Sequence, residues 1–198
     1  PKFLVICRRH IFFLRRRLFN IATVKRSYTV GEQHYDIGNE LYERMLDREM
    51  NYTCGYWKGM DILKDWKDPK KLDKAEEAKL DLICRKLYLK KGMKVLDTGC
   101  GFGNFARFAA ANYGVKVVGF TISKEQAVKA RERCKGLPVE IHVKDYREME
   151  KMEKFDRVAS IGIFEHITHK NYRTYMRFVD ASLKDDGLFL LHCIGSID

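Results

Sequence analysis

The spacing of hydrophobic residues changes about halfway along the chain. In the first half, apolar side chains recur every three or four positions, which is the repeat of amphipathic helices. A four-residue repeat that starts at Ile37 predicts a helix over about 36–47, and a similar pattern predicts a longer helix over about 72–89. The stretch between them, residues 50–68, is aromatic and contains glycines, so we predict a loop there.

From residue 93 onwards, short apolar segments alternate with helical patterns. The predicted strands are Lys94–Asp97, Lys116–Thr121, Val139–Val143, Asp156–Ile161 and Leu188–Cys193. The predicted helices are Phe102–Asn112, 124–134 and Lys170–Leu183, the last ending near Gly187. Residues 146–154 make a crossover too short to predict a helix with assurance. Alternating strands and helices of this kind favour a parallel, doubly wound α/β sheet with about five strands.

The helix predicted over 124–134 has a recognisable start. Ser123 is placed to cap its first turn, and Gln126 stands at the reciprocal position of a capping box. We therefore expect the Gln126 side chain to return a hydrogen bond to the backbone of Ser123.

The first 30 residues differ from the rest of the chain in charge. The 198 residues contain 38 Lys and Arg against 27 Asp and Glu, a net charge of +11. Residues 1–30 hold eight of the cations and no acid, which leaves 30 cations against 27 acids for the rest. A cationic segment of this kind usually meets an anionic partner, either nucleic acid or an anionic membrane.

The stretch Phe3–Phe19 alternates apolar clusters with arginine clusters and predicts a basic amphipathic helix. A helix that packs on a further domain is an equally good interpretation. Residues 34–198 show no basic surface interleaved with aromatic residues, so we do not expect a nucleic-acid partner. The longest apolar runs are four residues, too short to cross a membrane.

The chain has six cysteines, and no two lie within four positions of each other. That spacing contains no CxxC motif for a metal or a redox centre. Free thiols in a reducing cytoplasm are the simplest interpretation, and we predict no metal site.

The loop Val95–Gly103 indicates the class of cofactor that the chain binds. It reads VLDTGCGFG, ends the first predicted strand and opens a helix, and its glycines let the backbone approach a ligand closely. A dinucleotide fingerprint would need a glycine where Asn104 stands. The DxGxG pattern instead fits class I S-adenosylmethionine-dependent methyltransferases, which have a Rossmann-like fold.

Ligands of parallel sheets bind at the carboxyl ends of the strands, so we place the cofactor there. Asp97 suits its cationic end. Thr121, Ile122 and Gln126 follow the second strand and Asp145 follows the third, where they would hold the ribose and adenine. Many methyltransferases have an acid at the position of Thr121. Asp145 could alternatively be a solvated acid in a turn.

Three chemically unusual residues should meet at the same edge of the sheet. Glu165 follows the fourth predicted strand, His192 ends the fifth, and Cys54 lies in the aromatic loop. Each alone has an ordinary structural explanation, since a lone histidine is often structural and a lone cysteine often acts as a small hydrophobe. Their convergence beside a cofactor site favours a catalytic group.

Six segments give the chain a more specific resemblance. They are HYDIGN at 34–39, YTCGYW at 52–57, LDTGCG at 96–101, VGFTIS at 118–123, FEH at 164–166 and HCIGS at 192–196. With these segments the chain resembles the cyclopropane-fatty-acyl-phospholipid synthases and their mycolic acid relatives. One departure is Cys193, where many relatives have threonine.

The resemblance implies methylene transfer from S-adenosylmethionine to a cis double bond of an unsaturated phospholipid acyl chain, giving a cyclopropane through a carbocation. It implies bicarbonate as the base, bound by Cys54, Glu165, His192 and the backbone of Ile194. The cofactor positions that it implies are Tyr52, Thr53, Gly99, Gly101, Thr121, Ile122, Gln126 and Ile161, together with Asp145, Tyr146 and Arg147. A methyltransferase acting on N, O or C of a small molecule is the alternative.

The resemblance also sets expectations for organisation. We expect a basic amphipathic arm over 1–30, a helical lid over 31–91, and a cofactor-binding domain over 92–198. The lid contains the segment YTCGYW at 52–57, called the Tyr–Cys loop below. Because such sheets have seven strands and five are predicted here, we expect a C-terminally truncated piece that could be inactive by itself. The start at Pro1 rather than Met also indicates a fragment. The expected location is the cytoplasm, peripheral at the inner membrane face. A homodimer stays open.

Overall fold

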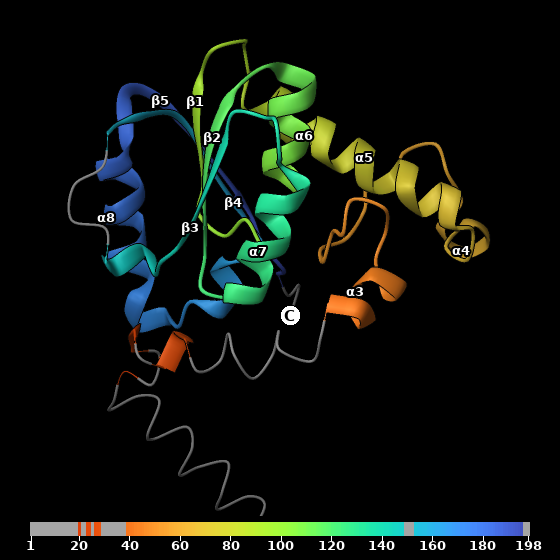
Figure 1. Ribbon diagram of the computed structural model, residues 1–198, viewed down its shortest axis with the longest axis horizontal. Coiled ribbons are helices and arrows are strands. Elements are labelled where there is room, and N and C mark those ends of the chain that lie inside the picture. Colours follow the sequence, from red (N-terminus) through yellow and green to blue (C-terminus); the bar gives the residue numbers. More distant parts are fainter. Residues whose placement is uncertain (1–19, 21–22, 25, 29–38, 149–152, 196–198) are drawn as a thin grey trace, which may run out of the picture.

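A computed structural model describes residues 20, 23–24, 26–28, 39–148 and 153–195 (Figure 1). The helix predicted over Phe3–Phe19 lies outside these residues. At the core is one five-stranded sheet in which every pairing is parallel. The strands are β1 Lys94–Asp97, β2 Lys116–Thr121, β3 Val139–Val143, β4 Phe155–Ile161 and β5 Leu183–His192, in the order β3-β2-β1-β4-β5. The predicted parallel α/β sheet is confirmed.

Helices cover both faces of the sheet (Figure 1). The helices are α3 Asn39–Met45, α4 Ile62–Asp65, α5 Pro69–Lys86, α6 Asn104–Tyr113, α7 Lys124–Arg133 and α8 Tyr172–Ser182. Short 3₁₀ turns occupy Tyr146–Glu148, Phe164–His166 and His169–Asn171. In one hydrophobic cluster, Leu80 of α5 and Phe105 of α6 pack on Val95 and Val117 of the sheet. Full burial of each such side chain contributes about 1.5–3 kcal/mol.

The opposite face of the sheet carries a second cluster. Tyr175 and Val179 of α8 pack there against Leu96, Phe120 and Val158, and all five are buried. Because both faces of the central strands are covered, Val95 and Leu96 of β1 point to opposite faces and are both fully buried, as expected for a central parallel strand.

Before β1, the structure differs from the prediction in the start of one helix and in an additional short helix. Helix α5 starts at Pro69, because the Asp68 side chain accepts a hydrogen bond from the Lys70 amide and proline is well tolerated in the first turn. The predicted loop 50–68 contains the one-turn helix α4, capped by Asp61. Both helix starts depend on capping aspartates, which the spacing of apolar residues does not reveal.

The start of β5 differs most from the prediction. Helix α8 stops at Ser182, one residue before its predicted end, but β5 begins directly at Leu183 instead of Leu188, so Gly187 lies inside the strand and not near a helix end. The pairing of β4 with β5 shifts register between Phe155 and Arg157. A side chain at Gly187 would come within 2.6 Å of Leu183, which explains why a glycine is needed in this irregular stretch.

The capping box predicted for α7 forms only in half. Ser123 does accept a hydrogen bond from the Gln126 amide, at 3.2 Å. The Gln126 side chain, however, accepts from the hydroxyl of Thr121 at 2.9 Å, and that hydroxyl accepts from the Ser123 amide. The reciprocal bond is therefore replaced by a tie to the end of β2.

Candidate active site at the carboxyl ends of the strands

A cavity of about 1170 Å³ opens where the strands end, between the sheet and the loop that precedes α4. Every residue that the sequence singled out for binding or catalysis lines it. These residues are Tyr52, Thr53, Cys54, Asp97, Gly99, Gly101, Thr121, Ile122, Gln126, Asp145, Tyr146, Arg147, Ile161, Glu165, His192 and Ile194. The tertiary structure thus gathers into one cavity side chains that are spread over about 140 residues of sequence.

The glycine loop forms the floor of the cavity between β1 and α6. Gly101 and Gly103 have φ values of +50° and +77°, which other residues adopt only at a cost. Nothing lies within 4 Å of where a Cβ on Gly101 would stand, so its backbone faces open space. The loop can therefore present its backbone to a ligand at close range.

Asp97 places a carboxylate beneath that loop. It is 1% exposed and accepts a hydrogen bond from the Gly99 amide at 3.3 Å. Burial raises the pKa of Asp97 to about 7, and the Gly99 amide opposes that rise. A cationic ligand would stabilise the ionised form, so the position suits a positively charged group.

Asp145 is not the solvated turn acid that was left open as an alternative. It is buried and forms an ion pair with Arg147, whose Nε and Nη2 lie 2.7 and 2.6 Å from its two carboxylate oxygens. Residues near the N-terminus also reach this rim. Arg147 donates to Ser27 Oγ at 2.8 Å, and the Asp145 amide donates to Tyr28 Oη at 3.1 Å.

Glu165, His192 and Ile194 meet at the ends of β4 and β5. The Ile194 amide donates to Glu165 Oε1 at 3.4 Å, and the Gly162 amide donates to the His192 carbonyl at 3.0 Å. Within the described part of the chain, Glu165 Oε2 and His192 Nδ1 are buried without a hydrogen-bond partner. Burying polar atoms in this way is costly, so the arrangement favours a polar ligand between them.

Burial lowers the pKa of His192 below its usual value. The charge of Lys79 adds to that effect, and the nearby Glu165 opposes it. His192 is therefore a neutral imidazole at neutral pH, with one nitrogen able to donate a hydrogen bond and the other able to accept one.

The chain matches a known protein family. A model of the family described as "Mycolic acid cyclopropane synthetase" matches residues 22–198. The chain belongs to the mycolic acid cyclopropane synthetase family. It is 52% identical over 180 residues to the cyclopropane-fatty-acyl-phospholipid synthase of Escherichia coli strain K12, an alignment that covers 91% of this chain and 44% of that protein.

Solved structures agree with this membership. The mycolic acid cyclopropane synthase CmaA1 complexed with SAH and CTAB superposes with a TM-score of 0.72 at 31% identity, over 82% of this chain and 55% of that one. Coclaurine N-methyltransferase bound to N-methylheliamine and SAH gives 0.71 at 27% identity, over 93% and 57%. The fold is thus the Rossmann-like fold of class I methyltransferases. The chain spans less than half of the Escherichia coli relative's length.

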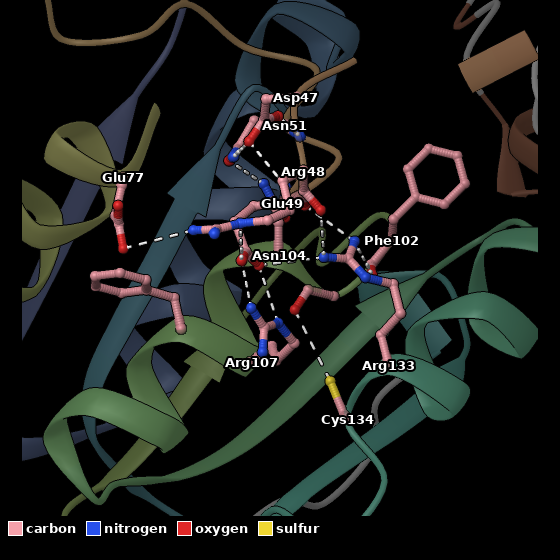
Figure 2. A network of polar contacts seen from close by, with 12 residues as sticks. Asp47, Arg48, Glu49, Asn51, Glu77, Phe102, Asn104, Arg107, Arg133 and Cys134 are labelled. Atoms are coloured by element: carbon pink, nitrogen blue, oxygen red, sulfur yellow. Dashed lines mark hydrogen bonds and ion pairs between the residues drawn. The ribbon is translucent and has the colours of Figure 1, made fainter. Parts of the chain in front are cut away.

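In this family member the Tyr–Cys loop is held by polar residues that the sequence analysis did not identify. Figure 2 shows part of the network, in which Glu49 lies between Arg107 and Arg133. Asn51 accepts from Asn104 and from the buried Lys79. The sequence offered one sign that Lys79 is buried. It is a charged residue on the apolar face of α5, where its neighbours Ala75 and Leu80 are fully buried.

The described residues contain no group of three or more His, Cys, Asp and Glu side chains arranged to hold a metal ion. The five cysteines among them are free thiols, with Cys54 and Cys193 exposed. No helix in the described part of this synthetase-family chain is long and apolar enough to cross a membrane.

Proposed function

We propose that this chain carries the cofactor-binding and catalytic core of a cyclopropane synthase. The reaction is methylene transfer from S-adenosylmethionine to the cis double bond of an unsaturated phospholipid acyl chain. The observation that carries the proposal is the pair of partnerless buried atoms, Glu165 Oε2 and His192 Nδ1, beside the Tyr–Cys loop. The 52% identity to the Escherichia coli synthase supports the same reaction.

The residues at the floor of the cavity fit S-adenosylmethionine, which supplies the transferred carbon when bound. Asp97 offers a buried carboxylate to its cationic amino-acid end, and the open backbone of Gly101 leaves room beside it. The Thr121–Gln126 pair presents neutral polar groups to the ribose in place of the usual acid. Tyr146 and the Asp145–Arg147 ion pair would border the adenine.

The atoms at the ends of β4 and β5 fit bicarbonate, which would supply a base. An ionised Glu165 only accepts hydrogen bonds, so it suits the hydroxyl of that ion. The neutral His192 ring and the Ile194 amide can donate to its other oxygens, and Cys54 lines the same cavity. Together these groups would hold a proton acceptor without presenting a strong base of their own.

The site must also position the alkene against the cofactor. An alkene is a weak nucleophile that no side chain can activate by removing a proton, so its alignment with the cofactor determines the rate. Tyr52 is 59% exposed at the cavity, and its ring meets that of Tyr42 edge-on, with centroids 5.6 Å apart. Aromatic faces of this kind stabilise a neighbouring cation by about 0.5–2 kcal/mol.

The lipid is presented at a membrane surface. The basic segment 1–30 supports this part of the proposal, because each Lys or Arg near an anionic surface contributes about 1 kcal/mol. The enzyme would then work in the cytoplasm, peripherally at the inner face of the membrane.

The test is to incubate the full-length protein that contains this chain with S-adenosylmethionine and phospholipids that carry monounsaturated chains. We expect a mass gain of one CH₂ unit per reacted chain and loss of the double bond. Dependence of the rate on added bicarbonate in bicarbonate-depleted buffer checks the proposed base. Untouched lipid would contradict the proposal.

A small-molecule methyltransferase is the second candidate, favoured by the likeness to coclaurine N-methyltransferase. A soluble amine assayed in parallel separates the two. Methylation of the amine with untouched lipid would establish this second reaction. That reaction would give no reason for Glu165, His192 and Cys54 to meet.

A further inference from the structure

We propose that Lys79 is a positioning residue of this site, holding the loop Tyr52–Cys54 against the end of β4. The proposal rests on the function proposed above, because it concerns how that site is kept in shape. Lys79 lies in α5, is 4% exposed and points its ammonium group into the protein. A lysine is almost never buried to this degree unless it has partners.

The partners of Lys79 identify what it does. Its Nζ donates to Asn51 Oδ1 at 2.9 Å and to Thr53 Oγ1 at 2.8 Å, and so contacts the loop on both sides of Tyr52. Its third neighbour is Glu76 Oε2, at 2.6 Å, an ion pair without hydrogen-bond geometry. Hydrogen bonds from a charged donor are stronger than those between neutral groups, so two of them can hold a loop in place.

Asn51 connects Lys79 to the glycine loop as well. Its Oδ1 also accepts a hydrogen bond from Asn104, the first residue of α6, which directly follows Gly103 (Figure 2). Asp47 accepts from both the backbone and the side chain of Asn51, at 2.6 and 2.9 Å. Lys79 is thus joined through one side chain to the segment beneath the cofactor.

Thr53 connects Lys79 to the end of β4. The Thr53 methyl group packs so closely on Gly162 that a Cβ there would come within 2.7 Å of it. Gly162 directly follows β4 and precedes Glu165 by three residues. The loop is therefore held between the ammonium of Lys79 and the strand end that carries Glu165.

The loop also needs to be held. Met50 has a φ of +55°, a left-handed conformation that is unfavourable for a residue with a side chain. Its neighbours are both restrained. Glu49 is held by Arg107 and Arg133 (Figure 2), and Asn51 is held by Lys79. Strain of this kind persists only where the surroundings determine it. Removal of Lys79 would allow the loop to relax.

Stability alone does not explain a buried Lys79–Glu76 pair. Burial raises the pKa of Glu76 to about 7, and replacing such pairs by uncharged residues of similar volume often leaves stability unchanged or higher. The contacts of Lys79 with Asn51 and Thr53 give the cation a positional role that an apolar residue could not fill.

The experiment compares five proteins: the wild type, the double variant Lys79→Met/Glu76→Gln, the control Lys74→Met, and the wild type and the double variant each with Thr53→Val added. The double variant removes both charges together, so no buried carboxylate is left unpaired. Lys74 is an exposed lysine of the same helix. For each protein we would measure the unfolding midpoint, the Kd for S-adenosylhomocysteine, and kcat and KM for phospholipid. A misplacement of about 1 Å costs up to about 100-fold in rate.

We expect the double variant to keep its unfolding midpoint, to bind S-adenosylhomocysteine more weakly and to lose at least about tenfold in kcat. Lys74→Met should match the wild type in all three. Adding Thr53→Val should weaken S-adenosylhomocysteine binding less in the double variant than in the wild type, because the two changes act through one contact. Additive effects, or wild-type kcat and Kd, would overturn the proposal.

The binding measurements keep this inference separate from the proposed function. If wild-type protein binds S-adenosylhomocysteine but converts no lipid, the proposed reaction fails. The affinities of the variants still decide whether Lys79 positions the loop.

Discussion

The Thr53 methyl group lies against the Cα of Gly162, so close that a Cβ on Gly162 would come within 2.7 Å of it. This contact joins the Tyr–Cys loop, which comes before the sheet in sequence, to the end of β4. Gly162 also has a φ of +68°, so both its backbone and its surroundings require glycine. The cavity keeps its shape at this point only if nothing larger than a hydrogen stands at residue 162.

Replacing Gly162 tests that contact. Gly162→Ala should lower the free energy of unfolding by about 1–2 kcal/mol from the backbone alone. It should also weaken S-adenosylhomocysteine binding, because the displaced Thr53 lines the cavity. Denaturant unfolding and calorimetric titration measure the two effects. The control is Gly136→Ala, where φ is +83° and the space is open. It should share the loss of stability but bind normally, and equal binding by both variants would contradict the prediction.

Glu165→Gln should separate binding from turnover. The amide keeps the size of the side chain, but its oxygen accepts a hydrogen bond from a hydroxyl group more weakly than a carboxylate does, and its NH₂ group cannot accept one at all. We expect a Kd for S-adenosylhomocysteine close to that of the wild type and a fall in kcat of about 100-fold or more. Asp185→Asn, an exposed change on the same strand as His192, serves as the control. Full activity in Glu165→Gln would remove Glu165 from the catalytic groups.

The raised pKa of Asp97 predicts a pH dependence of stability. Burial favours the neutral acid in the folded protein, so the folded state retains a proton between about pH 4 and pH 7 that the unfolded chain has released. This contribution to stability is present at low pH and is lost as the pH rises toward 7. Glu76, also raised to about 7, acts in the same direction.

Asp97→Asn removes that contribution. Without cofactor, the free energy of unfolding of the wild type should fall as the pH rises from 5 to 8. In Asp97→Asn this fall should be smaller by about 2–3 kcal/mol. The same variant should bind S-adenosylhomocysteine more weakly, because the cationic end of the ligand loses its partner. An unchanged pH dependence in the variant would show that Asp97 is ionised in the folded protein throughout.

The basic segment is tested by removing residues 1–19, which leaves Ser27 and Tyr28 in contact with Arg147 and Asp145. The deletion removes Lys2, Arg8, Arg9, Arg15, Arg16 and Arg17. We expect flotation with anionic vesicles to be lost, and the binding of the intact chain to weaken as salt screens the charges. Zwitterionic vesicles are the control, and they should bind both proteins equally weakly. Equal binding of the two proteins to anionic vesicles would exclude the segment as a membrane anchor.

The order and type of most elements could be predicted from local pattern. The apolar segment at 94–97 and those at 116–121 and 139–143 are strands with the predicted bounds, because a buried parallel strand is marked by its own residues. The glycines of the DxGxG loop are local features too, since each is required by its own backbone conformation or by what approaches it. Glu165 and His192 could be placed because parallel strands all end at one edge of the sheet.

Other features depend on partners far away in the sequence. Neither Lys79 nor Asn104 belongs to a motif, yet both bind Asn51. The side chain of Gln126 turns to Thr121 instead of completing its capping box, and β5 starts early because it pairs with β4 around Phe155. The sequence by itself determined the sheet, the cofactor loop and the residues along its edge, since these follow from short-range periodicity and strand direction. Only the tertiary structure decided how the Tyr–Cys loop is held above them, because buried ion pairs and close packing form between segments that no local pattern connects.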